Sequence, residues 1–127
     1  MNVHVMVVED NEAARDLMDV ALSQAGFQVS AVSNGEAALD LMSRQRFGLV
    51  LLDVHMPRLS GLEVLEAIGR LKNKPPVLMV SADTDGKIVR KAVGLGCIGY
   101  VAKPFLPNDL ITRARWALAG PVPMTMH

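Results

Sequence analysis

The chain has 127 residues, half of them apolar, which suits one domain with a buried core; we expect it over residues 1–120, followed by a tail at 121–127. Its 13 basic and 13 acidic residues cancel, so no broad charge attracts nucleic acid or an anionic membrane. Cys97 is the only cysteine, which excludes an internal disulfide framework and suits a reducing compartment. With no signal-like start and no apolar run near the ~20 residues that span a bilayer, the sequence predicts a cytoplasmic protein.

Short apolar runs alternate with amphipathic stretches along the chain. This alternation is typical of a parallel sheet with helices packed on both faces. The predicted strands are residues 3–8, 27–32, 49–52, 77–80 and 99–102. Since an amphipathic stretch follows each strand, we expect five strand-helix pairs in one α/β domain.

The first two helices are predicted from apolar residues at helical spacing. The first ends at Gly26, because glycine tolerates the left-handed conformation that closes a helix. Its inward residues are Ala14, Leu17, Met18, Ala21, Leu22 and Ala25. Asn34 and Gly35 open the second helix. Its inward residues are Ala38, Leu41 and Met42.

The last three helices begin at residues that favour a helix N-terminus. Ser60 can cap the third helix, and the prolines at 75–76 end it because the residue before a proline resists helical geometry. Its inward residues are Val64, Leu65, Ile68 and Leu71. Residues 83–85 offer caps for a fourth helix over about 86–95, and Pro107 fits the first turn of the fifth.

Polar residues follow the carboxyl ends of four predicted strands. They are Glu9 and Asp10 after the first strand, Asp53 after the third, Ser81 after the fourth and Lys103 after the fifth. Asp53 alone could be an ordinary turn aspartate. In open α/β sheets, however, ligands bind beyond the carboxyl ends of the strands. We therefore expect these side chains to converge on one site.

The residue types indicate the chemistry of this site. Three carboxylates at ~4 Å repel by roughly 4 kcal/mol per pair at an effective dielectric near 20, so the cluster needs a cation. Oxygen ligands with places left for water favour Mg²⁺, with Mn²⁺ as the alternative. Asp53 would be the nucleophile towards a phosphoryl group, since a carboxylate is ionised at neutral pH. Lys103 would neutralise charge and Ser81 would donate a hydrogen bond.

In this order the motifs resemble those of the receiver domains of two-component response regulators, and the resemblance covers nearly the whole chain. The matching residues are the acidic pair Glu9 and Asp10, the phosphorylated aspartate Asp53, the hydroxyl and small residue Ser81 and Ala82, and the lysine with its proline, Lys103, Pro104 and Phe105. The resemblance implies a doubly wound, five-stranded parallel sheet of flavodoxin-like order 2-1-3-4-5. It also implies a phosphorylation-dependent switch rather than an enzyme with its own substrate.

Further roles follow from the resemblance. Mg²⁺ would be held by Asp10, Asp53 and the backbone carbonyl of His55, with Glu9 acting through water. Ala82 would join Ser81 and Lys103 around the phosphoryl group. The Lys103–Pro104 bond would be cis, which holds for only about 5–6% of such bonds in folded proteins.

The resemblance also predicts how the signal passes. Ser81 would move towards the phosphoryl group and Tyr100 would rotate inward, changing the surface of the fourth helix, fifth strand and fifth helix. The donor would be a histidine kinase or a histidine phosphotransfer protein, and the output an unknown downstream protein or a tethered domain, with no direct nucleic-acid or membrane contact. Residues 97–99 replace the polar residues of many relatives, so this output surface is expected to be unusually apolar.

Several residues carry competing interpretations. His55 and Asp83 flank the path of an attacking water and would modulate the lifetime of the phosphate, whereas a metal-ligand role for His55 lacks a second histidine. Trp116 is equally a partner anchor or a shield over the helix-sheet seam. Residues 94–99 match G-x-G-x-x-G, but they close a helix and lead into a strand, so a dinucleotide site is rejected.

Two other functions remain open at the level of sequence. A phosphatase of the haloacid-dehalogenase type would also use Asp53 and Mg²⁺, but it usually needs a second acid where this chain has His55, and a cap for which no insertion is long enough. A receiver-like fold kept only for protein binding need not retain the acids, hydroxyl and lysine together. The chain would stand alone or be the receiver of a longer regulator.

Overall fold

The computed structural model describes residues 3–120. One parallel sheet of five strands has the order β2-β1-β3-β4-β5. The strands are His4–Val8 (β1), Gln28–Val32 (β2), Leu49–Leu52 (β3), Val77–Ser81 (β4) and Gly99–Ala102 (β5). The predicted doubly wound, flavodoxin-like fold is therefore confirmed, and the order places a topological switch point between β1 and β3.

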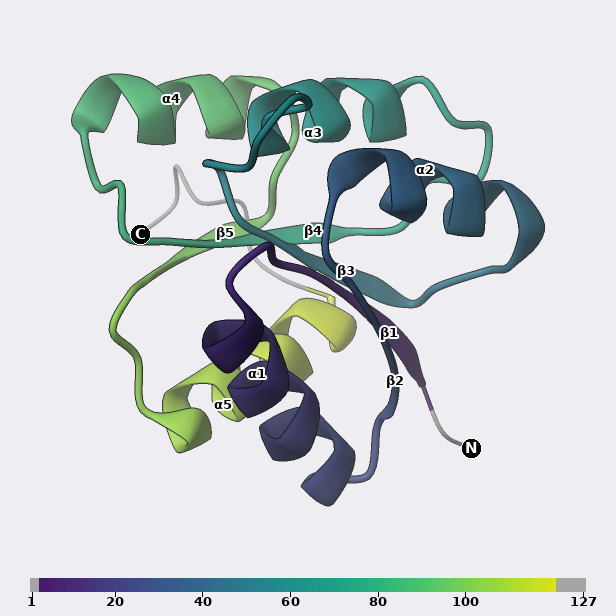
Figure 1. Ribbon diagram of the computed structural model, residues 1–127, viewed down its shortest axis with the longest axis vertical. Coiled ribbons are helices and arrows are strands. Elements are labelled where there is room, and N and C mark those ends of the chain that lie inside the picture. Colours follow the sequence, from purple (N-terminus) through teal and green to yellow (C-terminus); the bar gives the residue numbers. More distant parts are fainter. Residues whose placement is uncertain (1–2, 121–127) are drawn as a thin grey trace.

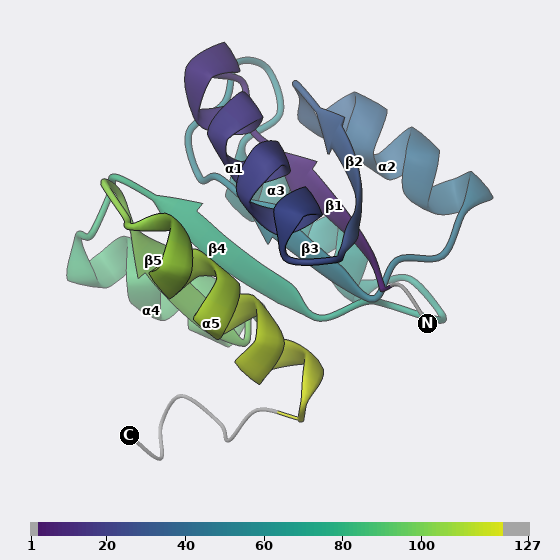
Figure 2. The same cartoon turned by 90° about the horizontal axis from the view of Figure 1, so that it is seen from below.

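Five helices connect the strands and cover both faces of the sheet. They are Glu12–Gln24 (α1), Gly35–Arg44 (α2), Gly61–Gly69 (α3), Gly86–Gly94 (α4) and Pro107–Leu118 (α5). Helices α1 and α5 lie on one face, and α2, α3 and α4 lie on the other (Figures 1 and 2). None of the helices within residues 3–120 combines the length and apolarity needed to cross a membrane.

The core consists of two apolar layers, one on each face of the sheet. Strand β3 is buried on both faces, and its residues alternate between the layers: Val50 and Leu52 pack towards α2, α3 and α4, while Leu49 and Leu51 pack towards α1 and α5. Burial of each such side chain contributes roughly 1.5–3 kcal/mol relative to exposure. This explains why the sequences of the central strands are continuous apolar runs, which end where the polar residues of the site follow.

Local sequence signals set where several helices begin. Ser60 caps α3 through its hydroxyl, which accepts from the Glu63 backbone N–H at 3.2 Å, and the Glu63 side chain returns the contact in a capping box. Asn34 caps α2 through its side-chain oxygen Oδ1, which accepts from the Ala37 backbone N–H at 2.8 Å, and Pro107 lies in the first turn of α5, as predicted. These signals fix the polar loops from which the site is built.

Two apolar side chains that were predicted to face the core are exposed instead. Leu17 on α1 is 45% exposed, and Leu71 is 37% exposed because α3 ends at Gly69, before it. Helical spacing identifies the apolar side of a helix, but it does not predict how many of the residues on that side the sheet covers. Both residues therefore contribute to surfaces rather than to the core.

Candidate functional site

Strand register brings the predicted polar residues together. Val8 of β1 pairs with Leu52 of β3, so Glu9 and Asp53 leave adjacent strands side by side. The Asp53 backbone N–H donates to the Val8 carbonyl at 3.2 Å, which extends this pairing by one residue. Ser81 pairs with Ala102 in the same manner, so β4 ends beside the start of the loop that carries Lys103.

The three acids form a compact cluster. Carboxylate oxygens of Glu9, Asp10 and Asp53 all lie within 4.8 Å of one another. Glu9 is 1% exposed and Asp53 is 8% exposed, while Asp10 faces solvent. Burial raises the pKa of Glu9, and the hydrogen bond from Lys103 opposes part of that rise. Such a group of buried anions is stable only beside positive charge.

Lys103 supplies a positive charge to two of the acids. Its ammonium donates to a carboxylate oxygen of Glu9 and to Oδ2 of Asp53, the latter at 2.9 Å. Burial alone would lower the pKa of Lys103, but the hydrogen bonds with Glu9 and Asp53 outweigh it and raise that pKa. The Lys103–Pro104 peptide bond is cis, as the resemblance implies.

The donor set fits a hard divalent cation. Its atoms are carboxylate oxygens, and the exposure of Asp10 leaves space for water, which Mg²⁺ retains when it binds proteins. Glu9, Asp10 and Asp53 are the residues that would hold such an ion.

A tight loop holds the backbone after Asp53. The Gly61 backbone N–H donates to the Val54 carbonyl at 2.7 Å, and a Cβ at position 61 would lie 1.8 Å from the carbonyl oxygen of Asp53. Only glycine permits this approach between the start of α3 and the end of β3. Arg58 adopts a positive φ of 68° in the same loop, which reverses the chain before the Ser60 cap.

The loop after β4 links four of the predicted residues. The Asp83 backbone N–H donates to the Ser81 hydroxyl at 3.1 Å, and the Tyr100 hydroxyl donates to the Asp83 backbone carbonyl. His55 Nε2 lies 2.5 Å from Asp83 Oδ2, and this contact lowers the pKa of the Asp83 carboxyl. Burial raises the pKa of the Tyr100 hydroxyl. Sequence reasoning placed His55 and Asp83 near the site separately but did not foresee their direct contact.

An apolar hollow of about 330 Å³ adjoins Lys103. It lies between α1 and the loop after β5, and its lining consists of Ala14, Leu17, Ala82, Lys103, Pro104 and Phe105. Ala82 is exposed and lines this hollow together with Lys103. Sequence reasoning missed this surface because it assigned Leu17 to the core; the only available signal was an apolar residue at the edge of the helical stripe.

At the amino-terminal end of β5, Gly99 lies close to Leu78 and α5. A Cβ at position 99 would lie 2.7 Å from Leu78 Cδ1 and 3.1 Å from the Arg113 guanidinium, which itself lies 5.5 Å from the Trp116 ring centre. Cys97 is buried, and burial raises its pKa to about 11. Residues 97–99 therefore pack in both layers: Cys97 lies in the layer that faces α2, α3 and α4, and Ile98 lies with Trp116 in the layer that faces α1 and α5.

Known proteins share both the sequence pattern and the fold. The family model of the response regulator receiver domain matches residues 5–115. The uncharacterized transcriptional regulatory protein YkoG of Bacillus subtilis is 38% identical over 117 residues, which cover 91% of this chain and 50% of that protein. The response regulator MprA of Mycolicibacterium vanbaalenii is 35% identical over 125 residues, covering 97% of this chain and 53% of that protein. The chain thus spans about half the length of these relatives.

A solved structure agrees with the sequence comparison. The chemotaxis response regulator CheY4 of Vibrio cholerae superposes with a TM-score of 0.86 at 27% identity, covering 93% of this chain and all of that one. The shared architecture extends across the whole sheet, and so includes the edge where Asp53 and Lys103 meet.

Proposed function

The chain belongs to the response regulator receiver domain family, and from this premise we propose that Asp53 accepts a phosphoryl group from a phosphohistidine donor. Response regulators of two-component systems receive signals from histidine kinases and act on output domains. The observation that carries the proposal is the position of the Asp53 carboxylate, buried at a strand end among Glu9, Asp10 and Lys103. Burying these charges costs free energy, and a role in phosphoryl transfer accounts for that cost.

In the proposed step, a carboxylate oxygen of Asp53 attacks the phosphorus of the donor. A new P–O bond forms, the P–N bond breaks, and the histidine leaves as imidazole after it takes up a proton. Lys103, which donates to Asp53, would neutralise charge on the phosphoryl oxygens, and the hydroxyl of Ser81 would donate a hydrogen bond to one of them. Water later attacks the same phosphorus and releases inorganic phosphate.

The proposed cofactor is Mg²⁺, with Mn²⁺ as the alternative. Asp10, Asp53 and the backbone carbonyl of His55 would hold the ion, and Glu9 would act through water. When bound, the ion supplies positive charge to the oxygens of the phosphoryl group. Lys103 also contacts Glu9 and Asp53, so it would add to the positive charge that the ion supplies.

We propose a donor protein that covers the apolar hollow beside Lys103. Leu106, which follows Phe105 in the chain, is 69% exposed, and Val20, one helical turn after Leu17 on α1, is 53% exposed, so both add apolar surface next to residues that line the hollow. A histidine kinase or phosphotransfer protein resting on this surface would bring its histidine within reach of Asp53. Burial of these side chains would supply affinity that a single phosphoryl contact lacks.

The proposed output runs through Ser81 and Tyr100. Because Tyr100 is bound to the carbonyl of Asp83, any movement of Ser81 towards a phosphoryl group is transmitted to the tyrosine and to the surface of α4, β5 and α5. His55 and Asp83 are proposed to modulate the phosphate lifetime, since their contact joins the two loops beside Asp53. The recipient is a downstream protein or a tethered domain in the cytoplasm, and residues 1–120 form the receiver unit.

The experiment that tests this function is intact mass after incubation with Mg²⁺ and a small acyl-phosphate donor. Asp53→Asn and a chelated sample serve as controls. A Mg²⁺-dependent phosphoryl adduct on the wild type that is absent from the variant is the expected result. Steady turnover of a phosphate ester would favour the phosphatase alternative, and absence of an adduct from both donors, the small molecule and a phosphohistidine protein, would favour a binding-only fold.

A further inference from the structure

We propose that a hollow at the amino-terminal ends of β3 and β4 binds an acidic segment of a partner protein that carries one large apolar side chain. Asp53 follows the last residue of β3 and Ser81 is the last residue of β4, so this hollow lies at the opposite edge of the sheet. The four residues of β3 alone separate the two edges by on the order of 13 Å. The proposal therefore goes beyond the phosphorylation site and does not depend on its chemistry.

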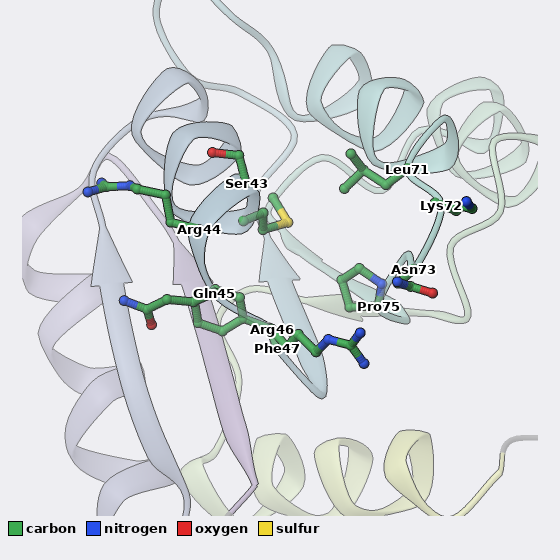
Figure 3. A pocket seen from close by; sticks show the side chains of 10 residues that line it. Ser43, Arg44, Gln45, Arg46, Phe47, Leu71, Lys72, Asn73 and Pro75 are labelled. Atoms are coloured by element: carbon green, nitrogen blue, oxygen red, sulfur yellow. The ribbon is translucent and has the colours of Figure 1, made fainter.

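Two connections form the hollow. One runs from the last turn of α2 into β3, and the other runs from α3 into β4 (Figure 3). The volume is about 350 Å³, within the range of roughly 300–1,000 Å³ that is usual for ligand pockets. The space is large enough for one bulky side chain together with part of a backbone.

Four of the ten residues that line the hollow are apolar, and we call these four its floor. Met42, Phe47 and Pro75 line it half-buried, and Leu71 lines it with 37% of its surface exposed. The Phe47 ring packs against the ring of His4 with 4.4 Å between centroids, so it is supported from the sheet side. Part of this apolar surface faces solvent, where a partner side chain would cover it.

The rim of the hollow is positively charged. The lining includes three cations, Arg44, Arg46 and Lys72, and no acid. Arg70 and Lys74 add positive charge beside it, and residues 43–48 and 69–76 contain no acidic residue. Arg44 pairs with Asp40 at 2.7 Å, and Arg70 pairs with Glu66 at 3.2 Å, both over one exposed helical turn. Exposed pairs of this kind contribute little, so a partner carboxylate can replace them at small cost. Charge complementarity therefore selects an acidic partner.

The placement of the cations favours an extended occupant. Arg44 and Lys72 point to opposite sides of the hollow in Figure 3, so they flank the apolar floor instead of converging on one point. A small anion would contact only one of them. A nucleic-acid backbone would contact the cations but leave the apolar floor unfilled. A peptide with acids on both sides of one large apolar residue satisfies both features.

The test is a selection of displayed random dodecapeptides on the whole chain. Arg46→Glu/Lys72→Glu reverses the charge of the rim, and Lys87→Glu/Lys91→Glu makes the same change of charge on exposed positions of α4. Leu71→Ser alters the floor without changing charge. All five side chains are exposed, and unchanged thermal unfolding midpoints will show that each variant folds.

We expect the selected peptides to contain at least two acids around an aromatic or large aliphatic residue. In fluorescence anisotropy their affinity should fall at least tenfold with the rim variant, several-fold with Leu71→Ser, and less than twofold with the α4 variant. Replacing the apolar residue of the peptide with alanine should also cost at least tenfold. The proposal would be overturned if the selection returned no peptide or only neutral or basic peptides. It would also be overturned if both charge variants lost the same affinity, or if a DNA duplex bound the rim as tightly as the peptides.

Discussion

The two edges of the sheet carry opposite charges and hold them differently. At the carboxyl edge, the loops contain five acids, of which Glu9 and Asp53 are buried and bound to Lys103. At the amino edge, residues 43–48 and 69–76 contain five cations, all exposed, with ion pairs only along helix surfaces. A formal net charge of zero therefore conceals a separation of charge from one end of the molecule to the other.

This difference indicates that the carboxyl edge serves a chemical reaction and that the amino edge serves the recognition of a partner. Burying charge costs free energy unless hydrogen bonds and opposite charges compensate, so a buried cluster indicates reactive groups held in fixed positions. Exposed charges cost little and contribute little to folding, but they orient a partner. Substitutions at the carboxyl edge should therefore lower the free energy of unfolding strongly, whereas substitutions at the amino edge should mainly change the affinity for a partner.

The largest expected effect concerns the backbone behind Asp53. Gly61→Ala would place a Cβ 1.8 Å from the Asp53 carbonyl oxygen, so the loop after β3 must move. We expect a loss of about 3 kcal/mol or more in the free energy of unfolding. Urea denaturation measures it. Gly69→Ala is the matched control, because nothing lies within 4 Å of its added Cβ, and it should be neutral or slightly stabilising; equal losses would contradict the predicted clash.

Removing the ammonium group of Lys103 should cause a smaller loss in the free energy of unfolding. Lys103→Met leaves Glu9 and Asp53 without their shared ammonium, and we expect about 2 kcal/mol of destabilisation in the presence of a chelator. Mg²⁺ should recover most of this loss, because it supplies the missing positive charge. Denaturation curves with and without Mg²⁺ test this, with Lys91→Met as the exposed control. A loss that Mg²⁺ does not reduce would show that the acids do not bind the ion together.

The third effect is a pH dependence of Mg²⁺ binding. Burial raises the pKa of Glu9, so on acidification Glu9 takes up a proton at a higher pH than an ordinary glutamate, whose pKa is about 4.3. Because the ion prefers the carboxylate, affinity should be full above the raised pKa and fall as the pH drops through it. Calorimetric titration across mildly acidic pH measures this. The Glu9→Gln variant should bind Mg²⁺ more weakly, and its affinity should depend less on pH. If its affinity depended on pH as in the wild type, Glu9 would not be the group whose protonation weakens binding.

The smallest effect belongs to the amino edge. Arg44→Gln removes the ion pair with Asp40, in which both side chains are 66% exposed, and it should change the free energy of unfolding by less than about 0.5 kcal/mol. Thermal unfolding at low and high salt provides the measurement. A loss above 1 kcal/mol would mean that the charges of this edge stabilise the fold, which would remove the contrast between the two edges.

Much of the carboxyl edge could be predicted from the sequence because its signals are local. An apolar run buried on both faces must end where Asp53 begins, and parallel pairing brings Glu9 beside it. Caps such as Ser60 identify where helices begin. The alternation of runs then leaves few folds to consider, and the strand order was predicted correctly.

Other features depend on how loops meet, which no local pattern encodes. The contact of His55 with Asp83 joins two loops that are 28 residues apart. The approach of Gly61 to the Asp53 carbonyl follows from the path of the whole connection. Leu17 and Leu71 were assigned to the core by spacing, yet both are exposed, and each lines a surface proposed here to bind another protein.

The most direct test of the account is to trap and locate the acyl phosphate. After phosphorylation in the presence of Mg²⁺, borohydride reduces an aspartyl phosphate to homoserine, which tandem mass spectrometry identifies by position. We expect homoserine at Asp53 alone, and none without Mg²⁺. Modification at Glu9 or Asp10, or an adduct that does not depend on Mg²⁺, would contradict the claim that the carboxyl edge holds one carboxylate that accepts a phosphoryl group with the help of Mg²⁺.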